Sequence, residues 1–189
     1  MNCLEDLTDQ IAQKDLFLIF SEATAIKNTG VDIVGQLSAL EYNIIVVTSN
    51  QPYSNLIRNY EERKIDVSSI FFVDMITRYA LGKEPETNGS KNYNFISSPS
   101  NLTGAGIAIN EFLIENDGKK TAVVFDSVTT MLIYLSSDKV SKFLHYLTNK
   151  FRIMGVKGFF LAVDGGIDPA LEVMFTTFMD CVIRTNKKN

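Results

Sequence analysis

The feature that most constrains this fold is a series of short, continuously apolar runs separated by segments with helical periodicity. The runs are rich in β-branched and aromatic residues. Continuous rather than alternating apolarity indicates strands covered on both faces, as in a parallel sheet between layers of helices. The expected strands are Leu16–Phe20, Ile44–Thr48, Ile70–Val73, Thr121–Phe125, Gly158–Val163 and a last one near Cys181–Arg184.

Between these runs, apolar residues recur at steps of three and four, which is typical of helices that lay one face on a sheet. The clearest stripe is Val140, Phe143, Leu144, Leu147 and Phe151, and others begin at Ile33, Tyr53, Leu102 and Leu171. Pro52 suits a helix start, and Gly155 suits a helix end. The alternation predicts an α/β fold, a three-layer sandwich with a mainly parallel central sheet.

Length and charge narrow the classes of function. The 189 residues fit a single domain spanning 1–189, and the net charge of -4 argues against nucleic-acid binding. No apolar stretch approaches the length of a membrane span, and the N-terminus lacks a signal-peptide pattern, so we expect a cytoplasmic protein. Cys3 and Cys181 lack metal-site spacing, and residues 82–91 are polar and expected to form a mobile loop.

The segment after the first strand stands where a phosphate-binding loop would lie. Phosphate loops read G-x-x-x-x-G-K-[ST], because glycines let consecutive backbone N–H groups converge on the phosphates. Here Ser21 and Ile26 replace the glycines, Lys27 matches the lysine, and Asn28 replaces the hydroxyl residue. We expect the next helix to begin near Val31, which leaves Lys27 as an ordinary surface-loop lysine in preference to a relic of phosphate binding.

A second candidate position is Asp126, which ends the strand Thr121–Phe125 and precedes Ser127. A carboxylate at a strand tip can hold Mg²⁺ through water beside a nucleotide, or it can cap the helix that follows. Taken alone, the motif favours the capping role. The only histidine, His145, lies on a helical stripe, where a packed or partly exposed side chain is expected in preference to a catalytic base.

Several stretches together resemble the RecA/KaiC-like ATPases of archaea. They are residues 43–74, the Asn-Leu-Thr-Gly at 101–104, residues 123–132 around Asp126, residues 142–147 and the closing run 180–184. The resemblance implies a RecA-like P-loop NTPase fold over nearly the whole chain. It also implies that active members carry the glycine loop and acidic residues after the second strand. This chain has Ser49-Asn50-Gln51 at that place, and neither an amide nor a hydroxyl can act as the base.

Two functional hypotheses follow. The favoured one is a non-hydrolysing KaiC-like domain with a degenerate phosphate loop, no catalytic residue, no bound metal and no cofactor. It would regulate or scaffold through protein contacts, as a homo-oligomer or paired with an active paralogue. The alternative is a nucleotide-binding sensor or weak ATPase that binds ATP and Mg²⁺ through Lys27, Asp126 and Ser127. Together with Asn28, these residues make up the expected vestigial nucleotide site.

Overall fold

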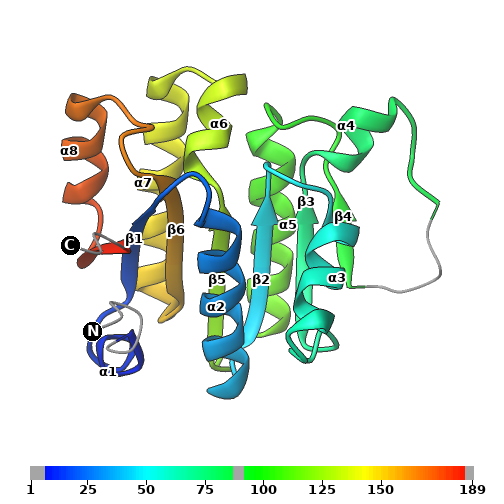
Figure 1. Ribbon diagram of the computed structural model, residues 1–189, viewed down its shortest axis with the longest axis horizontal. Coiled ribbons are helices and arrows are strands. Elements are labelled where there is room, and N and C mark those ends of the chain that lie inside the picture. The colour runs from blue at the N-terminus through cyan, green and yellow to red at the C-terminus, as the bar shows by residue number, and fades with distance from the viewer. Residues whose placement is uncertain (1–6, 87–91, 186–189) are drawn as a thin grey trace.

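A computed structural model describes residues 7–86 and 92–185 (Figure 1). All strand pairs in its seven-stranded sheet are parallel, in the order β4-β3-β2-β5-β6-β1-β7. The strands are β1 (Leu16–Ser21), β2 (Asn43–Thr48), β3 (Ile70–Asp74), β4 (Tyr93–Phe95), β5 (Thr121–Asp126), β6 (Lys157–Val163) and β7 (Cys181–Thr185). The helices are α1 (Leu7–Gln13), α2 (Ile26–Ala39), α3 (Tyr53–Glu62), α4 (Thr77–Leu81), α5 (Leu102–Glu115), α6 (Val128–Tyr134), α7 (Ser137–Met154) and α8 (Pro169–Thr177).

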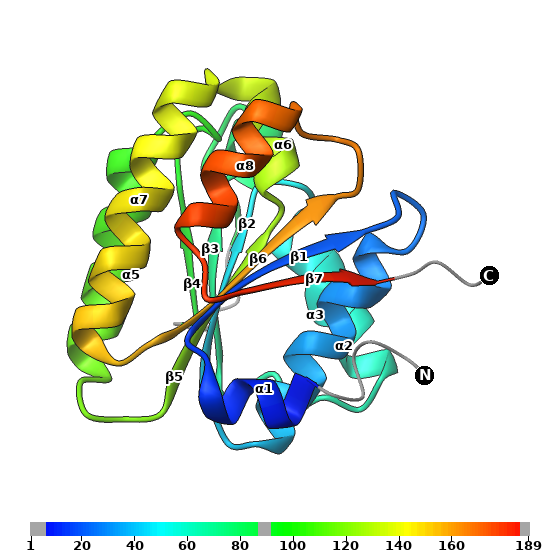
Figure 2. The ribbon, with the colours of Figure 1, turned by 90° about the vertical axis from the view of Figure 1, so that its left-hand side faces the viewer.

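Helices cover both faces of the sheet. Figure 2 shows α1, α2 and α3 on one side and α5, α7 and α8 on the other. Each side has its own apolar core: residues of α2 and α3 pack on one face of the strands, and residues of α5, α7 and α8 pack on the opposite face. This arrangement confirms the expected three-layer α/β sandwich, and it explains why the strands are apolar on both faces.

The expected strands are all present, and three short elements were not expected. These are α1, α4 and β4, each too short to show a periodic pattern. The expectation that the helix after the first strand begins near Val31 is wrong, because α2 begins at Ile26. Of the expected loop at 82–91, residues 87–91 lie outside the described part of the chain, as does Cys3.

The sheet brings the carboxyl ends of its central strands to one edge. β5 lies between β2 and β6, and Thr48 is in register with Asp126. β1 lies between β6 and β7, and Ser21 is in register with Val163. Ligands of open parallel sheets bind beyond this carboxyl edge, and the predicted site residues lie there.

Candidate functional site at the carboxyl edge of the sheet

The connection between β1 and α2 is a tight turn of residues 22–25. The carbonyl of Glu22 accepts hydrogen bonds from the backbone N–H groups of Ala25 and Ile26, both at 2.9 Å. The hydroxyls of Ser21 and Thr29 share a buried hydrogen bond of 2.8 Å that ties the end of β1 to the first turn of α2. The side chain of Ile26 is buried in the core beneath α2.

The backbone of this turn lacks the left-handed conformation that glycine-rich loops use. Among the described residues, positive φ occurs only at Glu41, Lys64, Gly82, Gly118, Gly155 and Gly165. None of these lies between Ser21 and Asn28, so the early start of α2 agrees with an ordinary strand-to-helix turn. A β-branched residue at Ile26 is unstrained there because it has helical geometry.

Lys27 and Asn28 lie exposed in the first turn of α2, so the expectation of a surface-loop lysine is wrong in its element. The Asn28 carbonyl oxygen accepts a 3.5 Å hydrogen bond from the Arg63 guanidinium, which also pairs with Asp32 at 3.0 Å. Burial raises the pKa of the Asp126 carboxyl, and the positive charge of Lys27 is near enough to oppose that rise. The structure therefore brings Lys27 toward Asp126 and turns Asn28 toward α3.

Asp126 is buried at the end of β5, with 6% of its surface exposed. Its Oδ1 accepts a hydrogen bond from the Asn50 amide at 3.4 Å, and its Oδ2 accepts one from the Gln51 amide at 3.3 Å. Both amides come from the segment after β2, the strand beside β5. Burial raises the pKa of Asp126, although the two amides and Lys27 act in the opposite direction.

The expectation that Asp126 caps the next helix is wrong, because Ser127 does so. The Ser127 hydroxyl accepts from the backbone N–H of Thr130 at 3.3 Å and shares a 2.9 Å hydrogen bond with the Thr130 hydroxyl. Ser127 is buried, and the peptide bond that joins it to Asp126 is cis. Because it bonds both the backbone and the hydroxyl of Thr130, the Ser127 hydroxyl is committed to the start of α6. The Asp126 carboxylate faces the β2–α3 connection instead.

Asn50 and Gln51 are the site residues that sequence reasoning missed. They were considered only as replacements for an acidic base, whereas the structure makes them the hydrogen-bond partners of Asp126. Thr48 supports them, since its hydroxyl donates to the Gln51 carbonyl at 2.7 Å. Their position at the end of a strand marks them as possible site residues. Predicting that they meet Asp126 also requires the order of the strands in the sheet, which no local sequence pattern gives.

Two other strand-tip carboxylates are bound within the fold. Asp74 is fully buried and accepts from the backbone N–H groups of Tyr53, Ile76 and Thr77, each at 2.8 Å. Asp164 pairs with Arg184, which also pairs with Glu172 and lies over the Phe20 ring at 4.3 Å. These contacts brace the edge from β3 on one side to β7 on the other.

Residues 7–86 and 92–185 contain no cluster of metal-ligating side chains and no helix suited to span a membrane. Within that part of the chain, no three His, Cys, Asp or Glu side chains gather closely enough to hold a metal ion. None of the helices described there has both the length and the apolarity needed to cross a bilayer. His145 lies exposed on α7 and packs against the Phe178 ring at 5.0 Å, as expected for a helix-surface histidine.

Solved structures share this architecture at low sequence identity. An uncharacterised Pyrococcus horikoshii protein, PH0321, solved with an unknown peptide, aligns over 96% of this chain and 82% of its own, with a TM-score of 0.69 and 15% identity. The KaiC-like protein PH0186 from Pyrococcus horikoshii OT3 aligns over 93% and 73%, with a TM-score of 0.61 and 14% identity. The flagellar accessory protein FlaH of Methanocaldococcus jannaschii aligns over 90% and 70%, with a TM-score of 0.57 and 11% identity.

These similarities confirm the RecA/KaiC-like fold expected from the sequence, and at such identities they show the fold alone. Comparison with curated proteins finds no match. The model of a family of unknown function, DUF7504, matches residues 22–185, and the chain therefore belongs to that family.

Proposed function

We propose that this chain is a non-hydrolysing KaiC-like domain that regulates or scaffolds other proteins through direct contacts. The observation that carries the proposal is the pairing of Asp126 with the amides of Asn50 and Gln51. Both carboxylate oxygens accept hydrogen bonds from the segment where active relatives are expected to carry acidic residues. Amide N–H donors at this place disfavour the binding of Mg²⁺ by Asp126 and cannot activate an attacking water.

The β1–α2 turn supports the same proposal. Phosphoryl transfer depends almost entirely on positioning and electrostatic stabilisation, so a site without its phosphate cradle retains little rate enhancement. The helical Ile26 and the Ser21–Thr29 hydrogen bond hold the turn in a conformation unlike a glycine cradle. We infer that these residues do not fit ATP and Mg²⁺, and that the fold was retained for its surfaces. The peptide bound in the PH0321 structure supports a role in protein recognition for a domain of this shape.

The test is thermal denaturation of the full chain with and without millimolar ATP and Mg²⁺, together with a phosphate-release assay. We expect no change in melting temperature and no hydrolysis above background. A ligand at about 100 times its dissociation constant would add about 2.7 kcal/mol of apparent stability, an effect easily seen. Lys64→Ala is a matched control for the variants below, because Lys64 is an exposed lysine just after the end of α3, outside the β1–α2 turn.

The second candidate, a nucleotide sensor, is favoured by one observation: the charge of Lys27 reaches Asp126. If this role is correct, ATP and Mg²⁺ raise the melting temperature, and the ATP-dependent rise disappears in both Lys27→Ala and Asp126→Ala while Lys64→Ala keeps it. That result would overturn the non-hydrolysing scaffold as the complete description of the protein.

A further inference from the structure

The outer face of α5 and α7 exposes several large apolar side chains. Four large side chains there are more than half exposed: Ile107 at 53%, Ile114 at 62%, Tyr146 at 53% and Ile153 at 86%. Both helices lead into neighbouring parallel strands, so they run in the same direction along the sheet. Exposed apolar residues gathered on one face mark interaction surfaces.

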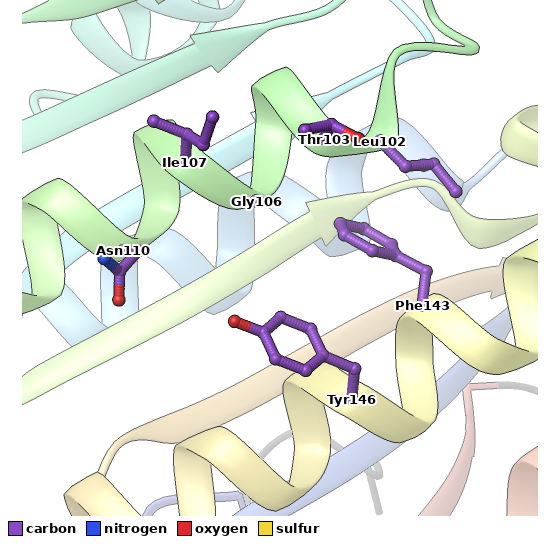
Figure 3. Close-up of a pocket in the computed structure, with 7 residues that line it drawn as sticks. All are labelled: Leu102, Thr103, Gly106, Ile107, Asn110, Phe143 and Tyr146. Atoms are coloured by element: carbon purple, nitrogen blue, oxygen red, sulfur yellow. The ribbon is translucent and has the colours of Figure 1, made fainter.

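A groove of 420 Å³ lies between the two helices. Gly106 leaves its wall without a side chain on α5, and Phe143 and Tyr146 reach toward it from α7 (Figure 3). The Lys150 ammonium donates to the Asn110 carbonyl oxygen across the groove and joins the two helices. The groove therefore has an apolar wall, and the Lys150 ammonium lies at one end.

The two helices carry opposite charge. α5 has two acidic residues, Glu111 and Glu115, and no basic one. α7 has four basic residues against the single acid Asp138. Lys142 pairs with Asp138 and Arg152 pairs with Asp180, whereas neither Glu111 nor Lys150 takes part in an ion pair within the described part of the chain. The α5–α7 face is thus acidic on one edge and basic on the other.

We infer that a second copy of this chain covers the α5–α7 face, with α5 of each copy lying in the groove of the other about a two-fold axis parallel to the helices. At 100° per residue, Ile107 and Ile114 point outward from α5, and Glu111 lies on the side turned away from α7. The two-fold operation then sets both isoleucines over the groove of the second copy and brings Glu111 opposite Lys150. Glu111 and Lys150 each gain an ion-pair partner, twice per dimer.

The size of the face sets the expected affinity. The 18 residues of α7 extend about 27 Å, and two helices about 9 Å apart present roughly 500 Å² per copy. The area buried over both copies, about 1,000 Å², is at the low end for specific interfaces, so we expect a dissociation constant in the micromolar range. The inference rests on the proposed role in protein contacts and names one such contact. Dimer formation is measured from the mass of the protein in solution, whereas nucleotide binding is measured from ATP-dependent melting. The dimer and the non-hydrolysing role can therefore fail separately.

Sedimentation velocity on the full chain from about 10 to about 500 µM tests for the dimer. We expect the wild type to shift from monomer to twice that mass as concentration rises. Ile107→Asp should remain monomeric throughout, while Val173→Asp should associate like the wild type. Val173 is a matched control because it is 67% exposed but lies on α8. Circular dichroism of each variant checks that the fold is kept.

A charge exchange tests the reciprocal geometry. Glu111→Lys and Lys150→Glu each place like charges together twice, so each should weaken self-association about tenfold. Mixed in equal amounts, the two variants should form a heterodimer, because both contacts are then attractive. A wild type that stays monomeric at about 500 µM, or a mixture no more associated than its components, overturns the inference.

Discussion

At the end of β5, Asp126 keeps a carboxylate where burial disfavours its charge. The raised pKa means that the folded state binds a proton more readily than the unfolded state, so stability falls as pH rises from the ordinary value of 3.8 through the folded pKa. Asp126→Asn removes this penalty and keeps the shape, and the Gln51 amide can turn to present its oxygen. Near pH 7 we expect the variant to be more stable by about 0.5–2 kcal/mol.

Urea unfolding of both proteins at neutral and acid pH measures the difference. It should shrink toward zero as pH falls to the ordinary range of Asp, where both side chains are neutral. A variant less stable than the wild type near neutral pH would mean that the fold needs the negative charge. The hydrogen bonds from Asn50 and Gln51 to the carboxylate would then outweigh the cost of burying its charge.

Asp180 illustrates the opposite sign. Burial alone would raise its pKa, but hydrogen bonds from Arg152 at 2.8 Å and the Leu16 backbone at 3.0 Å help to hold the pKa below the ordinary value. Its contribution to stability is therefore present above the unfolded pKa and is lost as pH falls through the folded pKa. Because Asp180 is exposed and solvent weakens its interactions, Asp180→Asn should cost about 0.5–1.5 kcal/mol near neutral pH and progressively less in acid.

The same urea experiment checks this prediction, with Asp138→Asn as the control. Asp138 also forms an ion pair, with Lys142 at 2.9 Å, but both of these side chains are well exposed. Its substitution should change stability by no more than about 0.5 kcal/mol. Equal losses in the two variants would mean that the contacts of Asp180 with Arg152 and Leu16 add no more stability than an exposed ion pair does.

Among the elements, those with long apolar patterns could be predicted from the sequence. α7 carries its stripe into the core and ends at Gly155, whose φ of 65° is left-handed, as the glycine predicted. Asp168 begins α8 by accepting from the Ala170 backbone at 2.9 Å. By contrast, β4 has three residues and α4 has five, so neither offers a period to detect. The sequence predicts too late a start for α2, because residues 21–28 align with a phosphate-loop motif and show no helical period of their own.

Gly158 shows how closely these elements pack. A Cβ at this position would lie 2.9 Å from Phe151 Cδ2 and 3.0 Å from Leu16 Cδ2, so α7, β1 and β6 meet there without room for a methyl group. Gly158→Ala should lower the free energy of unfolding by about 1–3 kcal/mol. At Gly106 a Cβ meets Phe143 at an ordinary 3.7 Å, so Gly106→Ala should be neutral or stabilising by up to about 1 kcal/mol. Thermal unfolding that ranks the two variants the other way would refute this account of the packing.

For the whole molecule, the sequence predicted the layers but only part of the site. Lys27 and Asp126 were identified by their places in a motif, and the structure brings them into electrostatic reach. The partners of Asp126 could not be predicted, because β2 lies beside β5 only once the full sheet is assembled. Contacts between segments 75 residues apart, such as Gln51 and Asp126, depend on that global order. The extent of the domain, 1–189, stays a prediction.

Self-association should also be visible in the stability of the whole molecule. If folded copies bind each other through Ile107 and the α5–α7 groove, mass action stabilises the folded state as concentration rises above the dissociation constant. The melting temperature of the wild type should then increase between about 5 and about 500 µM, whereas that of Ile107→Asp should stay constant. Val173→Asp, altered on α8, should follow the wild type. Ile107→Asp lacks the proposed contact. A rise in melting temperature shared by all three proteins would therefore point to nonspecific association and exclude the α5–α7 face as its cause.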